Sequence, residues 1–365
     1  MKKKKIVIAS VLKPADDVRA FEKMAMTLAG AGHRVYLIGM PSTTPVSPPN
    51  IHFLELVPFD RLSWKRLVAP FRIMKKIRKV KPELLIVNTH ELLIVSFLNR
   101  ILFGTRIVYD LQENYYRNIL WTHTFSRWLR MPLALWVRLK ERAIIPFHHR
   151  VTLAEKCYAE ELRFLPSRTV VLENKSVLPA NFRRKPSGDK IILAFTGTLG
   201  VSTGVYEAIE LAGKLYEKRA DIELHIVGSC ALPEVLADIM SKCSGKRYIK
   251  LVAGKMQVGH STILDLISKA HFGIVAYPPS PHTVARIPTK LFEYLSARLP
   301  VLLQDNPAWI ALTAPVSAAI VVDFRNPDVD RLLVEMTGTT FYTGPVDDFF
   351  WTSEEQKLLK LVEGV

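Results

Sequence analysis

The stretch IPTKLFEYLSARLP, residues 287–300, decides the fold of this chain, because it predicts a short helix with charged residues that leads into a buried strand. Thr289, Lys290 and Glu293 are three to four residues apart at most, so on a helix they share one face near its start. After Pro300, the apolar run 301–303 is typical of an interior strand of a parallel sheet. A helix start attracts phosphate, and a carboxylate beside it can accept hydrogen bonds from vicinal hydroxyls. The stretch therefore fits the two polar ends of a sugar nucleotide, and a surface ion pair between Lys290 and Glu293 explains the spacing equally well.

Length and composition favour two folded domains. The 365 residues are 49% hydrophobic and 23% charged, which is the balance of a folded globular protein. The three cysteines lack the spacing of metal ligands, so we expect buried thiols in a reducing, cytoplasmic compartment. The opening MKKKKIVIAS fits a first strand better than a signal peptide, and polar residues interrupt the apolar region 84–104. We therefore expect no membrane-spanning helix.

Positive charge is concentrated in the first half of the chain. The net charge is +16, and residues 1–186 hold 33 Lys and Arg against 14 Asp and Glu, whereas the remainder holds 17 against 20. This asymmetry indicates an anionic partner for the first half: an anionic membrane surface, a polyanionic substrate or nucleic acid. Nucleic acid is the least favoured of the three, because no nucleic-acid-binding module accompanies the charge.

Two segments of the first half combine basic and aromatic residues. Segment 61–81, which begins at Arg61, holds nine Lys and Arg together with Trp64 and Phe71, and segment 125–142 holds five together with two tryptophans. Helices of this kind lie on anionic membrane surfaces with their aromatic side chains in the interface. The alternative is a solvated basic face whose aromatic residues belong to the core.

Short β-branched runs alternate with helical patterns throughout the chain, which predicts parallel sheets joined by right-handed crossovers. The strands expected in the first half are 5–11, 35–39, 84–88, 106–111 and 150–153, with a first helix at 15–29. The strands expected in the second half are 191–196, 223–227, 249–252, 272–276, 301–303 and 319–322. The fold class is therefore α/β, with two doubly wound domains.

Domain boundaries follow from the places where this alternation stops. The stretch ENKSVLPANFRRKPSGDK breaks any regular element through its Pro and Gly residues, which predicts a linker at 174–190 between a first domain at 1–173 and a second at 191–346. Residues 347–365 have helical spacing, and Ser353 is a candidate cap. We expect this terminal helix to be able to pack back on the first domain.

Loops that follow the strands of the second half are the candidate ligand-binding segments, because ligands bind beyond the carboxyl ends of parallel strands. In FTGTLGVSTGV, residues 195–205, the glycines let the backbone approach a ligand and the free amides can hold a pyrophosphate, although a turn that needs positive φ explains them as well. Ser202 or Thr203 is a candidate start for the following helix. The residues that these loops offer are Gly197, Thr198, Thr203, Gly228, Lys255, Arg286, Thr289 and Lys290.

His90 and Glu113 are the candidate catalytic residues of the first half. Each follows a predicted strand, where a histidine or a carboxylate can act as a general base or orient a hydroxyl. Other acidic residues at strand ends have simpler explanations: Asp16 or Asp17 can cap the first helix, and Asp110 can end a strand.

The arrangement resembles the GT-B glycosyltransferases, especially the retaining transferases of glycosyltransferase group 1 (family 4-like). The resemblance rests on KLFEYLSARLPV at 290–301, on the opening KKIVIAS with LAGAGHRVYLIG, on VYDLQEN, on FTGTL and on the closing FWTSEEQKLL, and it covers nearly the whole chain. It implies two Rossmann-like domains that face a central cleft, and a hexosyltransferase-like, retaining activity.

The resemblance also implies roles for particular residues. Glu293 would accept hydrogen bonds from the ribose of a nucleotide-sugar donor, the Gly197 loop and the Lys290 region would hold the donor phosphates, and Gly228 with residues 252–254 would line the base pocket. The first domain would take a lipid-linked or polysaccharide acceptor. Basic side chains and helix amides would stabilise the phosphate charge, so neither a metal nor another cofactor is expected.

Three residues of the family's pattern are missing. A second glutamate is replaced by Ala285, and a histidine of the first domain is replaced by Gln112. The basic residue of the glycine-rich loop is absent too, since the matching positions are Thr198 and Thr203. Arg286 and Lys255 are candidates to supply the missing positive charge.

The leading hypothesis from the sequence is a glycosyltransferase of cell-surface glycan synthesis that works at the cytoplasmic face of a membrane as a peripheral protein. The alternative is a noncatalytic protein that binds sugar nucleotides or polyanions on the same scaffold.

Overall fold

The computed structural model describes residues 3–42, 44, 46–60, 63–121, 125–186, 188–256, 258–280 and 284–365. Arg61, at the start of the first basic segment, and residues 281–283 of the loop before residue 290 lie outside the described residues. The chain forms two compact units, Met1–Asn174 with Glu354–Val365, and Lys175–Ser353. Most of the stretch expected as a linker is thus counted with the second unit, and most of the terminal helix with the first.

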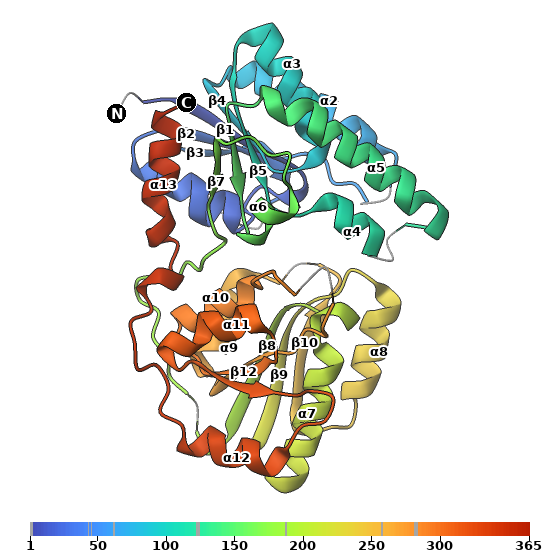
Figure 1. The fold of residues 1–365 in the computed structure, drawn as a ribbon, viewed down its shortest axis with the longest axis vertical. Helices are drawn as coiled ribbons and strands as arrows, with labels where there is room; N and C mark the ends of the chain where they lie inside the picture. Colours follow the sequence, from blue (N-terminus) through green and yellow to red (C-terminus); the bar gives the residue numbers. More distant parts are fainter. Residues whose placement is uncertain are drawn as a thin grey trace. The chain divides into compact units, whose positions relative to one another are not determined.

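The first unit is built on a parallel sheet of seven strands (Figure 1). Its strands are β1 (Lys5–Pro14), β2 (Arg34–Met40), β3 (Ile51–Phe53), β4 (Leu84–Val87), β5 (Arg106–Leu111), β6 (Arg150–Leu153) and β7 (Thr169–Val171), in the spatial order 3-2-1-4-5-6-7. All five predicted strands are present. The sequence did not predict β3 and β7, which are three-residue strands at the two edges, too short to show a pattern.

Helices connect these strands. They are η1 (Arg19–Ala25), α1 (Met26–Gly30), α2 (Lys65–Val80), η2 (His90–Leu92), α3 (Leu93–Phe103), α4 (Tyr115–Trp121), α5 (Arg127–Ile144), η3 (Ile145–Phe147) and α6 (Cys157–Glu161). The predicted first helix is in fact a π-helical segment, η1, that continues into α1. Within the described residues, no helix is long and apolar enough to cross a membrane.

The second unit has a parallel sheet of six strands. They are β8 (Ile191–Thr198), β9 (Ile222–Ser229), β10 (Ile249–Gly254), β11 (Phe272–Val275), β12 (Val301–Gln304) and β13 (Ala319–Val322), in the order 10-9-8-11-12-13. Its helices are η4 (Val201–Thr203), α7 (Val205–Lys218), α8 (Pro233–Cys243), α9 (His260–Lys269), α10 (Thr289–Ser296), α11 (Pro307–Thr313), η5 (Ala314–Val316), α12 (Val329–Gly338) and η6 (Asp347–Phe349). Asp328 caps α12 through a bond from the Arg331 amide, as an acidic helix start predicts.

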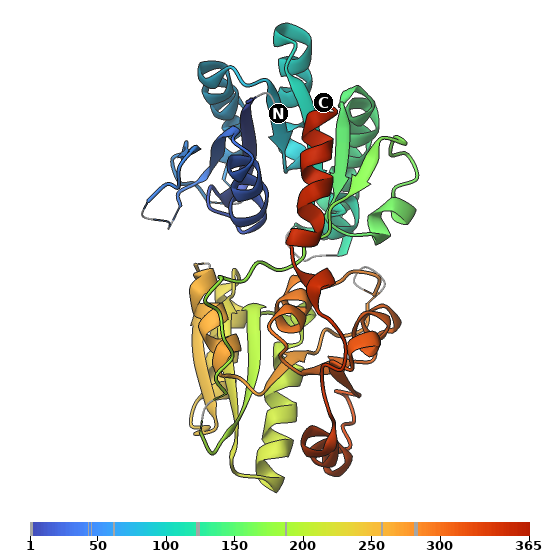
Figure 2. The same cartoon turned by 90° about the vertical axis from the view of Figure 1, so that its left-hand side faces the viewer.

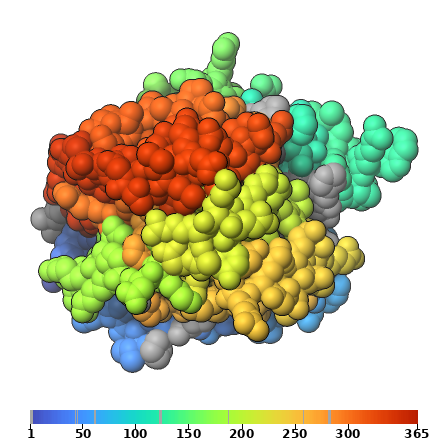
Figure 3. All heavy atoms as spheres, turned by 90° about the horizontal axis from the view of Figure 1, so that it is seen from below, coloured from blue at the N-terminus to red at the C-terminus, as the bar shows by residue number. Residues whose placement is uncertain are grey.

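Alternation along β8 divides the core of the second unit into two layers. Leu193 and Phe195 pack with α7, α8 and α12, whereas Ile192 and Ala194 pack with α9, α10 and α11. Strands buried on both faces are apolar at successive positions, as this one is. Figure 3 shows α7 beside α8 and α12 on the surface of the first of these layers.

Helix α13 (Thr352–Glu363) joins the first unit by its last turns, although it follows the second unit in the sequence. The Lys4 ammonium donates to the backbone carbonyls of Val362 (2.6 Å) and Val365 (2.7 Å). In Figures 1 and 2, α13 runs beside the first sheet in red. Ser353 lies inside this helix rather than capping it, since its hydroxyl donates to the Phe350 carbonyl.

Candidate functional site

The strand order of the second sheet identifies where a ligand-binding site is expected. From β8 the chain moves outward to β9 and β10, and from β11 it moves in the other direction to β12 and β13. In open parallel sheets, ligands bind beyond the carboxyl ends of the strands at this change of direction. The loop after β8 and the helix α10 that follows β11 therefore form the candidate site.

Three glycines in this region are required, either by a positive φ or by close contacts within the protein. Gly197 has φ +95° and Gly204 has φ +83°, and a Cβ on Gly204 would lie 2.0 Å from the Ala276 carbonyl oxygen. A Cβ on Gly228 would lie 1.9 Å from the carbonyl oxygen of Gly197. Gly204 and Gly228 thus allow backbone segments of the protein to approach one another, whatever ligand the loop takes.

The two threonines of the loop have different environments. Thr198, the last residue of β8, is exposed. Thr203 is buried, and its hydroxyl donates to the Gly200 carbonyl at 2.9 Å. The expectation that Thr203 starts the next helix is wrong: α7 begins at Val205 with Gly204 at its cap, because the hydroxyl is held inside the loop.

Lys290 is a buried cation without a hydrogen-bond partner among the described residues. Its side chain is 5% exposed, and its Nζ lies 3.8 Å from the centroid of the Phe195 ring and 5.2 Å from that of Tyr277. A Cβ on Gly197 would lie 3.9 Å from its Cε, so the side chain reaches the end of β8. Burial lowers the pKa of Lys290 to about 7, although the nearby Glu293 carboxylate acts in the opposite direction. The surface ion pair between Lys290 and Glu293 is therefore a wrong alternative.

Tyr294 fixes helix α10 on the sheet. Its hydroxyl accepts a bond from the Thr196 amide at 3.2 Å and lies 2.9 Å from the Thr196 hydroxyl, and its ring covers Gly273, where a Cβ would lie 2.4 Å from the ring. The first turn of the helix, with Lys290 and Glu293, is thereby held beside the end of β8. In KLFEY, residues 290–294, Tyr294 directly follows Glu293. The residue that fixes α10 on the sheet therefore also holds Lys290 and Glu293 in place.

Glu293 is partly buried on α10 and faces His260, the first residue of α9. Oε1 of Glu293 lies 3.4 Å from Nε2 of His260, and each side chain is 12% exposed. No motif in the sequence selects His260, which follows the loop after β10. Its place at a helix start beyond β10 is the only signal that could have identified it.

The remaining candidates of the second unit lie around α10. Lys255 is exposed directly after β10, two strands away from β8. Arg286 is partly buried, and its carbonyl accepts a bond from Nε1 of Trp309 at 2.6 Å. Thr289 is the first residue of α10. Among the candidates of the second unit, Gly197 and Lys290 are brought together by the distances described above.

In the first unit, His90 follows β4 and lies in a buried, charged environment. Lys140 donates to its Nδ1 at 3.2 Å, Glu91 lies 3.7 Å from its Nε2, and the ring packs edge-on against Tyr115. Burial lowers the pKa of His90 to about 4, and the Lys140 and Arg66 cations add to this effect against Glu91. At neutral pH the ring is therefore uncharged. Because Nδ1 accepts from Lys140, we assign the ring proton to Nε2.

Glu113 lies two residues beyond the end of the neighbouring strand, β5. Its Oε2 accepts a bond from Asn118 at 2.7 Å. Burial raises the pKa of Tyr115, and the Glu113 carboxylate is the next cause of the rise. His90 and Glu113 therefore both lie near Tyr115, from the ends of adjacent strands.

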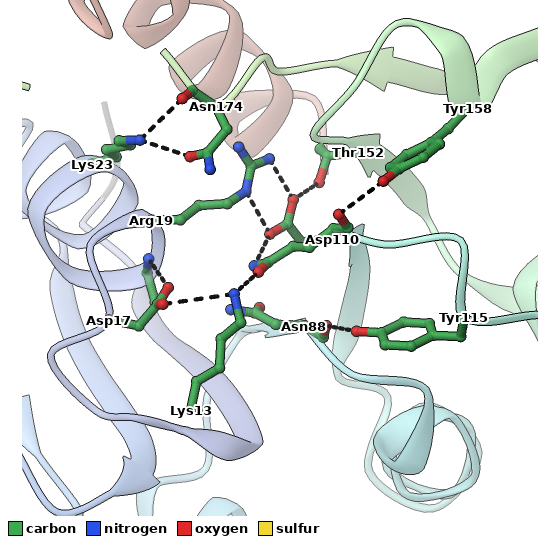
Figure 4. Close-up of polar contacts among 12 residues, drawn as sticks. Lys13, Asp17, Arg19, Lys23, Asn88, Asp110, Tyr115, Thr152, Tyr158 and Asn174 are labelled. Carbon is green, nitrogen blue, oxygen red and sulfur yellow. Dashed lines mark hydrogen bonds and ion pairs between the residues drawn. The ribbon is translucent and has the colours of Figure 1, made fainter. Parts of the chain in front are cut away.

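A buried ion pair lies beside these residues (Figure 4). Asp110, fully buried in β5, accepts two bonds from Arg19, at 3.0 and 2.7 Å, and one each from Thr152 and Gln112, both at 2.7 Å. Burial alone would raise the pKa of Asp110, but these donors hold it below its usual value. The side-chain oxygen of Gln112 also accepts from Lys13, so both the nitrogen and the oxygen of this amide are hydrogen-bonded. Asp110 therefore does more than end a strand, because its carboxylate is the centre of a buried hydrogen-bond network.

Asn88 is the unusual residue of this region. It is fully buried at the end of β4, its backbone carbonyl accepts from the Tyr115 hydroxyl at 2.9 Å, and its side-chain amide has no partner among the described residues (Figure 4). Such a group costs stability unless water or a ligand satisfies it. Asp17 accepts from the Ala20 amide at 3.2 Å, in agreement with its expected capping role.

Comparison of the whole chain with solved structures identifies the fold. Sucrose-phosphate synthase from Thermosynechococcus elongatus matches with a TM-score of 0.74 and 14% identity, over 99% of this chain and 98% of that one. The Anabaena protein HepE in complex with UDP and glucose matches with a TM-score of 0.69 and 10% identity, over 99% and 100%. WaaG, a glycosyltransferase involved in lipopolysaccharide biosynthesis, matches with a TM-score of 0.65 and 13% identity, over 97% and 95%.

No protein-family model and no curated protein sequence matches the chain. The structural neighbours share the GT-B fold of glycosyltransferases, so the predicted fold class of two doubly wound, parallel-sheet domains is confirmed. At identities of 10 to 14%, the similarity defines the fold of this chain.

Proposed function

We propose that this protein is a glycosyltransferase that moves a sugar from a nucleotide-sugar donor to a lipid-linked or polysaccharide acceptor in cell-surface glycan synthesis. In this reaction the bond between the sugar C1 and the donor phosphate breaks, a bond from C1 to an acceptor hydroxyl oxygen forms, and the hydroxyl proton leaves with the nucleoside diphosphate. The observation that carries the proposal is the buried Lys290 of α10, which reaches the end of β8 and has no hydrogen-bond partner within the described residues, in a fold used by glycosyltransferases.

Lys290 would neutralise the donor diphosphate. A buried ammonium that lacks a hydrogen-bond partner is the group expected to gain most from an anion within reach. A bound diphosphate would also raise the lysine pKa, so the side chain would be fully charged when charge develops on the leaving group. The free backbone amides in the first turn of α10 would donate further hydrogen bonds to the diphosphate.

Glu293 would accept hydrogen bonds from the two ribose hydroxyls. Its carboxylate lies one turn after Lys290 on the same face of α10, so the two side chains would contact neighbouring parts of one nucleotide. His260 is 3.4 Å away and would orient the carboxylate. Gly197 and Thr198 supply backbone at the same strand end, and Lys255, Arg286 and Thr289 are proposed to add contacts farther out.

The first unit would bind the acceptor at the ends of β4 and β5. With Nδ1 accepting from Lys140, the neutral His90 would donate from Nε2 to the acceptor rather than remove its proton. Glu113 would accept the hydrogen bond of the attacking hydroxyl. We propose retention at C1, which rests on the family resemblance alone, and we propose no metal requirement, because Lys290 and helix amides would supply the positive charge. Product stereochemistry and activity in EDTA test these two points.

The proposal is tested by measuring nucleotide binding and sugar transfer over a panel of nucleotide sugars. We expect Glu293→Ala to weaken binding of the preferred nucleoside diphosphate about tenfold or more, because a charged hydrogen-bonding partner is lost. Glu335→Ala, which removes an exposed carboxylate on α12, is the matched control and should bind normally. Absence of nucleotide binding by the native protein would contradict the donor site, and tight binding without transfer to any acceptor would favour a noncatalytic protein.

A further inference from the structure

Two helices of the first unit, α3 and α5, expose large apolar side chains while polar side chains lie on their buried faces beside apolar ones. On α3, Ser96 and Asn99 are buried, whereas Ile94, Leu98 and Ile101 are exposed. Inside the unit, the Ser96 hydroxyl lies 2.8 Å from Nε2 of His148, and the Asn99 amide donates to the Val95 carbonyl at 2.9 Å. A water-facing helix of a globular protein has the opposite pattern.

Helix α5 shows the same pattern more strongly. Lys140 and Glu141 are buried on its inner face, and burial raises the pKa of Glu141 to about 7. The outer face carries exposed large apolar side chains, and Trp128 among them is 88% exposed. These residues are Trp128, Leu129, Met131, Leu135, Trp136 and Leu139. Trp128, Met131, Leu135 and Leu139 are three to four residues apart and form a continuous stripe along the helix, and Leu129 and Trp136 widen it.

Helix α2 supplies the charge. Its N-terminal half exposes Leu67 and Phe71 after the exposed Trp64, and its C-terminal half exposes basic residues without any acidic residue between 63 and 81. The guanidinium of Arg78 lies 5.1 Å from the ring centroid of Phe103, which is exposed at the end of α3. Positive charge and exposed apolar surface are therefore adjacent.

The three helices belong to one surface. Helix α3 packs against both α2 and α5, and the three lie together on one side of the first sheet (Figure 1). Four of the six tryptophans of the chain are exposed, and all four lie in or next to α2, α4 and α5. Exposed apolar surface of this extent marks a contact with another molecule or with lipid.

We propose that the exposed faces of α2, α3 and α5 insert into the interface of an anionic lipid bilayer. A bilayer is favoured because tryptophans and leucines are arranged along helices with Lys and Arg beside them, as interfacial helices require. Basic side chains of α2 would contact lipid headgroups, while the apolar stripes of α3 and α5 would enter the acyl boundary. This surface would hold the enzyme where a lipid-linked acceptor lies, so it deepens the proposed function without depending on donor chemistry.

Vesicle flotation of the full chain, without any nucleotide, tests the proposal. We expect binding to vesicles of phosphatidylglycerol and phosphatidylcholine in equal parts, weaker binding to phosphatidylcholine alone, and loss of binding at high salt. Quenching of tryptophan fluorescence by brominated lipids would report insertion, because Trp309 and Trp351 are buried in the second unit and would not respond.

Two variants separate the apolar and the electrostatic contributions. The double variant Trp128→Ser with Leu135→Ser should bind vesicles about tenfold more weakly or worse, because two inserted side chains are lost. The double variant Lys75→Gln with Lys79→Gln should bind about 25-fold more weakly, since each basic side chain near an anionic surface contributes about fivefold. The matched control Met240→Ser with Val334→Ser removes exposed apolar side chains from the second unit and should bind as the native protein does.

The other occupants of this surface give different results. Absence of binding to anionic vesicles, or unchanged binding of both variants, would overturn the proposal. A stable dimer in sedimentation velocity that Trp128→Ser dissociates, together with failure to bind vesicles, would assign the surface to a second copy of the chain. Because vesicle binding is measured without a donor, its failure would leave the transfer reaction to be judged by the nucleotide experiments.

Discussion

Replacing Lys290 by Met should make the protein more stable and its nucleotide binding weaker. Met has a similar length and no charge, so it can fill the space beside Phe195 without the desolvated ammonium. A pKa that falls from 10.5 to about 7 corresponds to a free-energy penalty of about 5 kcal/mol on the charged form, at about 1.4 kcal/mol per pKa unit. The contact with Phe195 offsets about 2 kcal/mol of this. We therefore expect Lys290→Met to raise the free energy of unfolding by about 2 to 4 kcal/mol at neutral pH.

The pH dependence of this gain has a definite sign. Between pH 10.5 and about 7 the unfolded chain binds a proton at Lys290 that the folded chain does not bind, so the native protein loses stability as the pH falls through this range. The variant lacks this proton. Its advantage over the native protein should therefore be largest near pH 7 and small near pH 10.

Urea unfolding at the two pH values measures the stability, and calorimetric titration with the preferred nucleoside diphosphate measures the affinity. The affinity of Lys290→Met should fall about tenfold or more, because a charge-assisted bond to phosphate is lost. The control is Lys214→Met on α7, where the half-exposed lysine pairs with Glu210 in the preceding turn, and both properties should stay nearly unchanged. A Lys290→Met protein that is less stable than the native protein at pH 7, or that binds the nucleotide normally, would refute the reasoning.

Three further substitutions test the parts that support the site. Tyr294→Phe should destabilise the protein by about 1 to 3 kcal/mol in urea unfolding, because the buried amide on β8 loses its acceptor, and it should also weaken nucleotide binding by loosening α10. Arg19→Met should cost about 3 to 5 kcal/mol, since it leaves the Asp110 carboxylate buried without its cation. In the native protein the lowered pKa of Asp110 contributes stability above its usual value of 3.8, which is lost as the pH falls through the folded value; acid unfolding of Arg19→Met should no longer show this loss. Gly228→Ala should prevent the ends of β8 and β9 from pairing, and a variant with native stability would contradict the 1.9 Å contact.

The strands and the candidate site were predictable from the sequence to different degrees. Short runs rich in apolar residues identify interior strands such as 106–111 with correct ends, because burial on both faces leaves few polar positions. The edge strands at 51–53 and 169–171 were missed, since three residues carry no period. Spacing placed Lys290 and Glu293 on one helix, but it could not show that the first is buried against Phe195, from a strand almost 100 residues earlier in the chain.

The exposed apolar faces of α3 and α5 are the feature that the sequence pattern predicts least well. A hydrophobic stripe on α5 has the same period whether it faces the core or the surroundings, so the pattern left both interpretations of Trp128 open. The structure distinguishes them by the burial of Lys140 and Glu141 on the opposite face. The direct functions of His90 and Glu113 stay predictions, because they depend on a bound acceptor.

The return of α13 to the first unit has a consequence for the order of folding during synthesis. Residues 354–365 are made after the whole of the second unit, yet Lys4 at the start of β1 bonds to carbonyls of Val362 and Val365. During synthesis, the side of the first sheet that α13 covers therefore stays exposed until the last residues have been made. The second unit is contiguous in sequence, so it can fold as it leaves the ribosome. Truncation before residue 354 would leave this flank permanently exposed, so a fragment of residues 1–174 is a poor substitute for the first unit.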